Sequence, residues 1–108
     1  MNLETYELKA QVVKALAHPL RLAICEYLLE TKEPKCVNYI ASVFNKNQSV
    51  ISKHLSILQQ ASIVKIQKEG VFTRYTITDR KTLTQLIDSI NRLTKLNAAK
   101  KMNLIKSI

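Results

Sequence analysis

Apolar residues recur with helical spacing through the first sixty positions of the chain. In the first segment, which reaches about Ala17, two neighbouring stripes are apolar, so we expect this helix to pack against two partners. The stripes are formed by Leu3, Tyr6, Ala10, Val13 and Ala17 and by Leu8, Val12 and Leu16. Pro19 cannot continue a helix but suits the first turn of a new one. A second helix is therefore predicted from Pro19 to about Thr31.

Two shorter helical patterns follow, separated by a turn at residues 45–47. The first covers about residues 36–44, and the second covers residues 47–62, with Asn47 where an N-cap is expected. The apolar positions that would anchor the second helix to a core are Ile51, Leu55 and Leu58. Two short helices joined by a turn of about three residues fit a helix-turn-helix unit.

The other face of the segment 47–62 is almost free of acid and rich in hydroxyl and amide groups. Its polar stripe consists of Ser49, Ser52, Lys53, Ser56 and Gln60. In helix-turn-helix proteins the start of the second helix enters the major groove, where Ser and Gln bond to base edges and Lys bonds to phosphate. The pattern therefore indicates a DNA-binding face. An ordinary solvated helix face is the alternative.

After Ala61 the pattern changes from helical to β-rich. Strands are predicted at residues 63–68 and 71–78, and between them stands Gly70, the only glycine of the chain, which suits a positive φ at a hairpin tip. A two-stranded ribbon directly after a recognition helix is a wing. Its basic residues, which could contact the neighbouring minor groove or backbone, are Lys65, Lys68 and Arg74.

A last helix is predicted from about Arg80 to Leu96, with a stripe too apolar to stay in water. The stripe consists of Leu83, Leu86, Ile87, Ile90 and Leu93. Together with the first helix it predicts a two-helix dimer interface, which would match a palindromic operator. In the alternative, both helices cover one small core. We expect residues 1–96 to form the DNA-binding domain and residues 97–108 a basic tail or an extension of the helix.

Composition and charge narrow the function further. The 108 residues suffice for one domain, and they contain neither a membrane-spanning run nor the basic start of a signal peptide, so a cytoplasmic location without membrane contact is expected. Residues 1–33 carry a net charge of −1, and residues 34–108 carry +10. Such a local surplus is typical of a protein that binds a polyanion, and double-stranded operator DNA is the expected partner. A basic protein without such a partner is the alternative.

The order of these elements resembles that of the ArsR-type (ArsR/SmtB) winged helix-turn-helix repressors over residues 8–96. Residues 15–24 resemble the entry into the second helix of that family, residues 47–58 its recognition helix, and residues 70–77 its wing. The resemblance implies a fold that is mainly α with a β-hairpin wing, in the order α-α-α-α-β-β-α, and a dimer through the first and last helices. It also implies a homodimeric transcriptional repressor that leaves its operator when an inducer binds. The contacts implied by position are Gln48, Ser49, Ser52 and His54, with Arg74 from the wing.

Two histidines carry alternative interpretations. His54 lies at the edge of the polar stripe, so it could cap or pack as well as contact a phosphate. His18, just before Pro19, is interpreted as a helix-end residue rather than a ligand.

The signal that the protein senses is not evident from its residues. The arsenic site of the family starts its third helix with Cys-Val-Cys-Asp-Leu-Cys, where this chain reads Cys36-Val-Asn-Tyr-Ile-Ala, and its zinc-type site on the last helix keeps only Asp88 here. Because a tetrahedral site needs about four N or S ligands, no metal and no cofactor is expected. Cys36, at a helix N-terminus, is the candidate sensor thiol. Cys25 fits the apolar stripe of its helix and is the less favoured candidate.

Other classes of function are weaker interpretations. An enzyme is not expected, because the chain has no glycine-rich phosphate loop, no close acid-base pair and no nucleophile with a recognisable partner. The remaining alternative is a protein-interaction module on a winged-helix scaffold, in which the exposed helix binds a protein and no operator.

Overall fold

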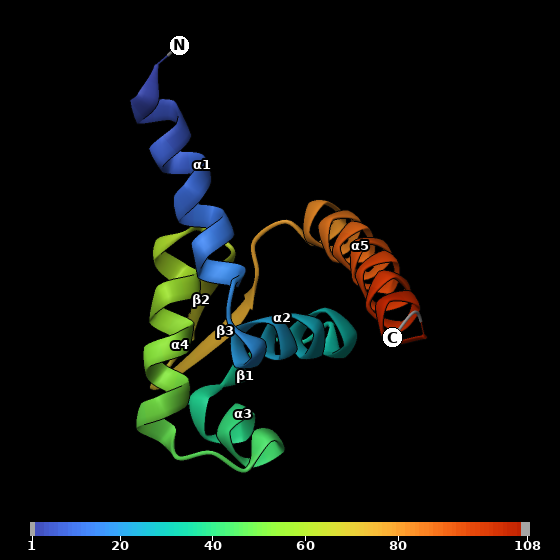
Figure 1. Ribbon diagram of the computed structural model, residues 1–108. Helices are drawn as coiled ribbons and strands as arrows, with labels where there is room; N and C mark the ends of the chain where they lie inside the picture. The colour runs from blue at the N-terminus through green and yellow to red at the C-terminus, as the bar shows by residue number, and fades with distance from the viewer. Residues whose placement is uncertain (1, 107–108) are drawn as a thin grey trace.

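The computed structural model describes residues 2–106, and for Ile105 it describes the backbone alone (Figure 1). In chain order the elements are α1 (Leu3–Leu16), α2 (Pro19–Thr31), β1 (Lys35–Cys36), α3 (Val37–Phe44), α4 (Gln48–Gln60), β2 (Val64–Glu69), β3 (Phe72–Ile77) and α5 (Arg80–Lys106). The predicted winged helix-turn-helix architecture is confirmed, with one strand more than the sequence pattern indicated. Within the described residues, no helix is both long enough and apolar enough to cross a bilayer.

Side chains just before the helices fix where four of them start, and at α5 this is Asp79, which accepts from the N–H of Thr82 at 3.1 Å. The side chain of Asn2 accepts a hydrogen bond from the backbone N–H of Glu4, and His18 accepts one from Leu20. Asn47 likewise accepts from the N–H of Val50 at 3.0 Å, as its position predicted. Such caps satisfy backbone donors that have no partner within the helix, so each one holds a helix start at a defined residue.

The sheet has the strand order β1-β3-β2, and both pairings are antiparallel. Gly70, with a φ of +60°, turns the chain between β2 and β3, as predicted for the only glycine. The additional strand β1 pairs with β3, where Cys36 lies opposite Arg74. A strand of two residues is too short to show a period in sequence, which is why the pattern did not reveal it. Val71, predicted to begin a strand, lies instead in the turn.

One apolar core joins α2, α3, α4 and the sheet, and it also takes in Ala15 and Leu16 of α1 and Leu83 and Ile87 of α5. Its fully enclosed side chains come from α2, α3, α4 and the sheet: Ile24, Cys25, Leu28, Ile40, Ile51, Leu55, Leu58 and Val64. The three residues predicted to anchor the second helix of the helix-turn-helix unit are all among them. The core therefore holds α4 by one face and leaves the opposite face exposed.

The two outer helices extend beyond this core. In α1 only Ala15 and Leu16 are buried, and Figure 1 shows its N-terminal half rising clear of the body. α5 is one helix from Arg80 to Lys106, so residues 97–106 of the expected tail continue the helix, and residues 107–108 lie outside the described part of the chain. In Figure 1, α1 rises from the upper left of the body and α5 lies at its right.

Candidate nucleic-acid interface

α4 presents an uninterrupted polar face at its N-terminal end. Predicted contact residues that are solvent-exposed on this helix are Gln48, Ser49, Ser52, Lys53 and Ser56. The helix contains no acidic residue. The hydroxyl of Ser49 donates to the Asn47 side chain at 2.8 Å, so in this structure it belongs to the cap. The unpaired N–H groups of the first turn add partial positive charge at the same end, which favours an anionic partner.

His54 differs from the other predicted contacts because it is half-buried and held within the protein. Its Nδ1 lies 3.1 Å from Nη1 of Arg21, and its ring stands 4.5 Å from the ring of His18, centroid to centroid. Burial lowers the pKa of His54, and the nearby His18, Arg21 and Lys53 lower it further. Of the two interpretations that its sequence position allowed, packing is the one this geometry favours. Its role at DNA stays a prediction.

The sequence pattern assigned no role to Arg21, another residue of this region. It extends from the first turn of α2, donates to the carbonyl of Ala15 at 2.6 Å and contacts His54 on α4. His18 caps α2 beside it, with Leu20 N–H donating to its Nδ1 at 3.1 Å, as expected of a helix-end residue. A signal was present: an arginine two residues after a helix-starting proline stands next to the unpaired carbonyls of the preceding helix.

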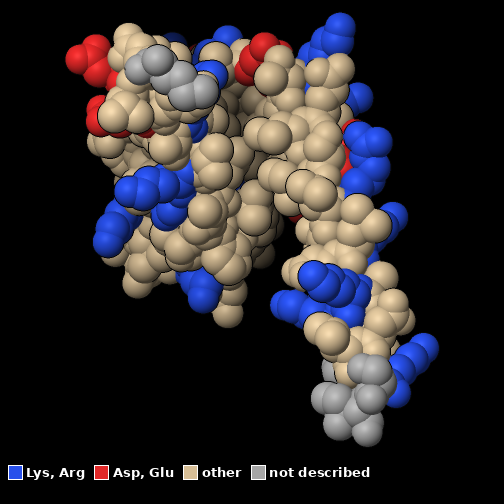
Figure 2. Space-filling view, turned by 45° about the horizontal axis from the view of Figure 1, so that its top comes forward, with Lys and Arg blue, Asp and Glu red and all other residues tan. Residues whose placement is uncertain are grey.

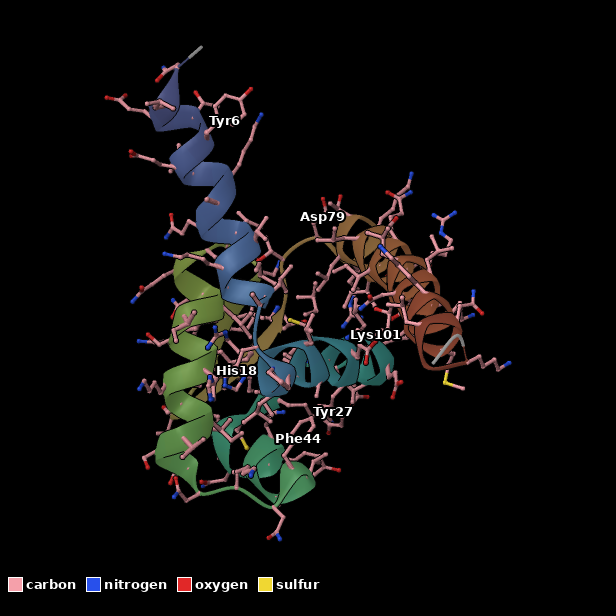
Figure 3. The ribbon with its side chains drawn as sticks, in the orientation of Figure 1. Tyr6, His18, Tyr27, Phe44, Asp79 and Lys101 are labelled. Atoms are coloured by element: carbon pink, nitrogen blue, oxygen red, sulfur yellow. The ribbon has the colours of Figure 1, made fainter. Side chains whose placement is uncertain are left out.

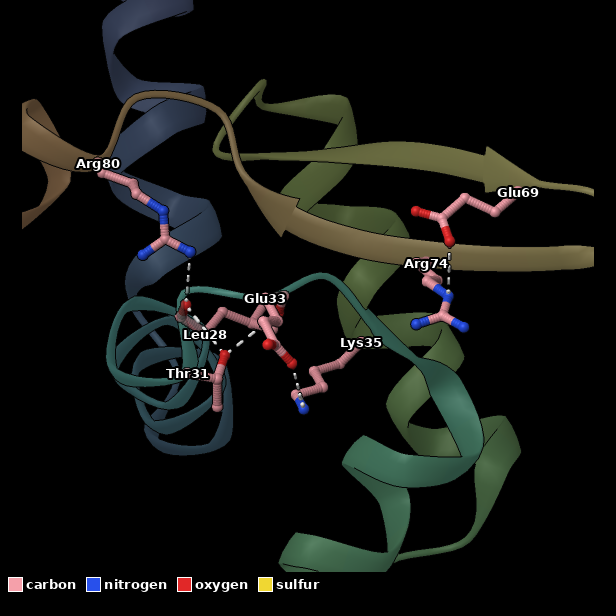
Figure 4. A network of polar contacts seen from close by, with 7 residues as sticks. All are labelled: Leu28, Thr31, Glu33, Lys35, Glu69, Arg74 and Arg80. Atoms are coloured by element: carbon pink, nitrogen blue, oxygen red, sulfur yellow. Dashed lines mark hydrogen bonds and ion pairs between the residues drawn. The ribbon is translucent and has the colours of Figure 1, made fainter.

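The hairpin of β2 and β3 carries the three basic residues predicted to contact DNA from the wing, of which Lys65 is exposed on β2. Lys68 is exposed, whereas Arg74 is half-buried and its Nε lies 3.7 Å from a carboxylate oxygen of Glu69 (Figure 4). The Arg74 guanidinium also lies 5.6 Å from the centre of the Phe72 ring. No hydrogen-bond partner within the described residues reaches the buried Nε. Arg74 is thus held against the wing by Glu69 and Phe72.

The two cysteines lie in contrasting surroundings. Cys25 is enclosed in the core, and burial raises the pKa of its thiol to about 12, with Glu26 adding to the rise. Cys36 is half-buried at the N-cap of α3 and makes no side-chain capping bond. Both thiols are free. Within residues 2–106 no three His, Cys, Asp or Glu side chains gather in a way that could hold a metal ion.

Charge and apolar surface are divided between different parts of the molecule. In Figure 2, lysine and arginine side chains surround the projecting end of α5, and acidic ones gather near the N-terminal helix. A groove of about 330 Å³ lies between α1 and α5. It is lined by Val12, Val13, Leu16, Ala17, Leu22, Leu86 and Ile90. Figure 3 shows Tyr6 far out on α1, well away from the body.

Comparison with known proteins identifies relatives of this chain. The sequence profile of the arsR family of bacterial regulatory proteins matches residues 18–65, the stretch that contains Arg21 and α4. The HTH-type transcriptional regulator MJ1325 of Methanocaldococcus jannaschii is 40% identical over 90 residues, which make up 82% of this chain and all of that protein.

Two further relatives are a repressor and a solved domain. The repressor SmtB of Mycobacterium tuberculosis is 28% identical over 87 residues, and these span 81% of this chain and 63% of the repressor. The homodimeric winged helix-turn-helix DNA-binding domain of Mb0332 from Mycobacterium bovis is a possible ArsR-family regulator. It superposes with a TM-score of 0.74 at 26% identity and covers 83% of each chain.

Proposed function

The chain belongs to the ArsR family of DNA-binding transcriptional regulators, and from that membership we propose that it is a homodimeric repressor that grips operator DNA with α4 and the wing. The family is one of regulators and not of enzymes. Its members bind operator DNA and form homodimers, and the proposal assigns those two tasks to particular residues of this chain.

The observation that carries the proposal is the exposed, acid-free N-terminal face of α4. Gln48 and Ser52 offer an exposed amide and an exposed hydroxyl for base edges, while Lys53 and the helix amides suit phosphates. Ser49 would leave its cap bond with Asn47 to reach a base, and Ser56 would contact DNA from the next turn. Side chains that bond to base edges supply sequence selectivity, and phosphate contacts supply register.

The wing supplies contacts outside the major groove. Lys68 is free to reach a phosphate, and Arg74 would exchange its ion pair with Glu69 for one with DNA. The exchange replaces a partly exposed ion pair of small net value, so it costs little. We assign to Lys68 and Arg74 affinity rather than selectivity.

The homodimer is assigned to the apolar faces of α1 and α5. Val13 and Leu93 are each 66% exposed, and Leu3 is 73% exposed. Large apolar side chains that stay in water on neighbouring helices mark an interaction surface. Large apolar side chains that continue along both helices support a second copy as the occupant. A two-fold dimer would set two copies of α4 on half-sites about one helical turn apart.

Release from the operator is assigned to an inducer or to modification of a thiol. Cys36 is the candidate because it ends β1 opposite Arg74 and stands at the N-cap position of α3, which packs against α4. A bulky or charged group on its sulfur would act on both the wing and the helix-turn-helix unit.

The test is a fluorescence-anisotropy titration of a labelled palindromic duplex, selected with this protein from a randomised pool, against a scrambled duplex. We expect selective binding that weakens by orders of magnitude between about 50 mM and 200 mM salt. Equal and weak binding to both duplexes, together with a helix-dependent protein partner, would instead support an interaction module. Changing Lys53 and Arg74 to Gln separates the two, because it should abolish DNA binding and spare such a partner.

A further inference from the structure

Three helices meet at the side chain of Arg21. Arg21 extends from α2, its Nε donates to the Ala15 carbonyl at 2.6 Å, and its Nη2 donates to the Lys14 carbonyl at 3.3 Å. Both carbonyls belong to the last turn of α1, where backbone acceptors lack partners within the helix. The guanidinium satisfies the Ala15 carbonyl, adds a second donor to the Lys14 carbonyl, which also accepts from the N–H of Ala17 at 3.1 Å, and opposes the negative end of the helix dipole. Arg21 thereby closes the end of α1.

The same guanidinium reaches α4. Its Nη1 lies 3.1 Å from Nδ1 of His54, and the His54 ring is backed by the ring of His18 at 4.5 Å. An arginine can only donate a hydrogen bond, so Nδ1 of His54 has to accept. His54 is therefore neutral in this arrangement, with its proton on Nε2. We call the set of Arg21, His54, His18 and the two α1 carbonyls the Arg21 joint.

We propose that Arg21 is a positioning residue that acts through His54 to fix the angle between α1 and the recognition helix α4. The inference rests on the proposed function, since the angle matters if α1 forms the dimer and α4 binds DNA. α1 has 14 residues and is thus roughly 21 Å long. It is buried only at Ala15 and Leu16, beside the joint. A tilt of about 10° at the joint would therefore move its far end by roughly 4 Å.

The consequence lies in the spacing of two recognition helices. In a dimer held by α1, each copy of α4 is positioned relative to its twin through this joint. Half-sites one turn of DNA apart tolerate little change in that spacing. Arg21 thus acts on operator affinity without itself reaching DNA.

The joint is sensitive to protonation. Adding a proton to Nδ1 of His54 would remove the acceptor and bring two cations within 3.1 Å of each other. The charged or titratable groups around His54 are His18, Arg21 and Lys53, and Glu7 and Lys14 line the hollow that Arg21 borders. Burial and the neighbouring cations keep the pKa of His54 below its usual value, so the joint is intact at neutral pH. It opens as the pH falls through that lowered pKa.

The first test uses the free protein and no DNA. NMR titration of the His54 ring protons should give a pKa below 6.5 in the wild type and a higher one in Arg21→Gln, because one of the cations is gone. Arg92→Gln, a matched loss of charge on the exposed face of α5, should leave the pKa unchanged. An unchanged His54 pKa in Arg21→Gln would overturn the joint.

The second test uses two replacements of His54. Asparagine places an oxygen near the position of Nδ1 and can still accept from Arg21, whereas glutamine places its amide near Nε2 and cannot. We expect His54→Asn to keep operator affinity within about 3-fold of wild type and His54→Gln to lose about 10-fold, the equivalent of about 1.4 kcal/mol. The reverse order would show that His54 acts through Nε2, as a direct DNA contact, and would overturn the inference.

The pH profile completes the test. Wild-type affinity for the palindrome should fall as the pH drops through the lowered pKa of His54 that the NMR titration measures, and His54→Asn should not show that fall. A wild type with no selective affinity for DNA would refute the proposed function, while the NMR titration would still decide on the joint. A protein that binds selectively but gives equal affinities for the Asn and Gln variants would refute the joint alone.

Discussion

α4 and the outer helices are all half-exposed, but their exposed faces are of opposite chemistry. The free face of α4 presents Gln48, Ser52 and Lys53, whereas α1 and α5 present side chains such as Val13 and Leu93. In each case the buried face is apolar. The apolar buried face is common to these helices, so the chemistry of the exposed face is what distinguishes the partners that each helix can bind.

The two regions also differ in how firmly they are held. Ile51, Leu55 and Leu58 of α4 are fully buried, so its polar face is presented by a rigid element. α1 is buried only at its C-terminal end, beside the Arg21 joint, so its N-terminal part has no buried anchor within the described chain. The proposed DNA-reading surface is built within one chain, whereas the proposed dimer surface needs two.

The largest effect is expected from disrupting the proposed dimer interface on the outer helices. Val13→Glu combined with Leu93→Glu puts charges into the proposed interface, where an unpaired charge is costly to bury. We expect a monomer in analytical ultracentrifugation and an operator affinity lower by at least about 100-fold, because one recognition helix then binds a half-site alone. Val71→Glu, the same change at a residue 93% exposed on the hairpin tip, should remain dimeric. A dimeric double variant would place the interface elsewhere.

The next largest effect is expected from the polar face of α4. Gln48→Ala with Ser52→Ala should lower affinity for the selected palindrome by about 10- to 100-fold and leave scrambled DNA unaffected, because contacts to base edges are worth about 1–3 kcal/mol each. Gln59→Ala is the matched control. It lies on a similar line of α4, near the C-terminal end, and should have little effect. Equal losses on both duplexes would show that these side chains bind phosphate.

A smaller effect is expected from the wing. Lys68→Gln should weaken binding by a few-fold on every duplex and lower the slope of log affinity against log salt by about 1, since one phosphate contact is lost. Lys81→Gln, an exposed lysine at the start of α5, serves as the control of equal charge. The same slope in both variants would remove Lys68 from the interface.

The sequence predicted those features that depend on repeated patterns. Asn47, Gly70 and the anchor residues of α4 lie where spacing and capping rules placed them, because each acts through its own backbone or a local period. Arg21 and β1 were not found. The partners His54 and β3 lie 33 residues or more away along the chain, where no local pattern records them. Only the bond of Arg21 to the end of α1 had a local signal, the position of the arginine just after Pro19. The proposed contact set contained His54, but not the arginine that holds it.

The smallest expected effect on DNA binding concerns the thiols. Iodoacetamide at about pH 8 should label Cys36 well before Cys25, because Cys25 is fully enclosed and burial raises its pKa to about 12. Mass spectrometry of tryptic peptides measures the two rates.

Cys36→Ser alone should change operator affinity by less than about 2-fold, because the Cys36 side chain makes no capping bond that serine would disturb. If labelling abolishes binding in the wild type but not in Cys36→Ser, the thiol beside the helix-turn-helix unit is the sensor. Binding that survives full labelling of Cys36 would leave the signal to an inducer that acts elsewhere, and the groove between α1 and α5 would be the next place to search.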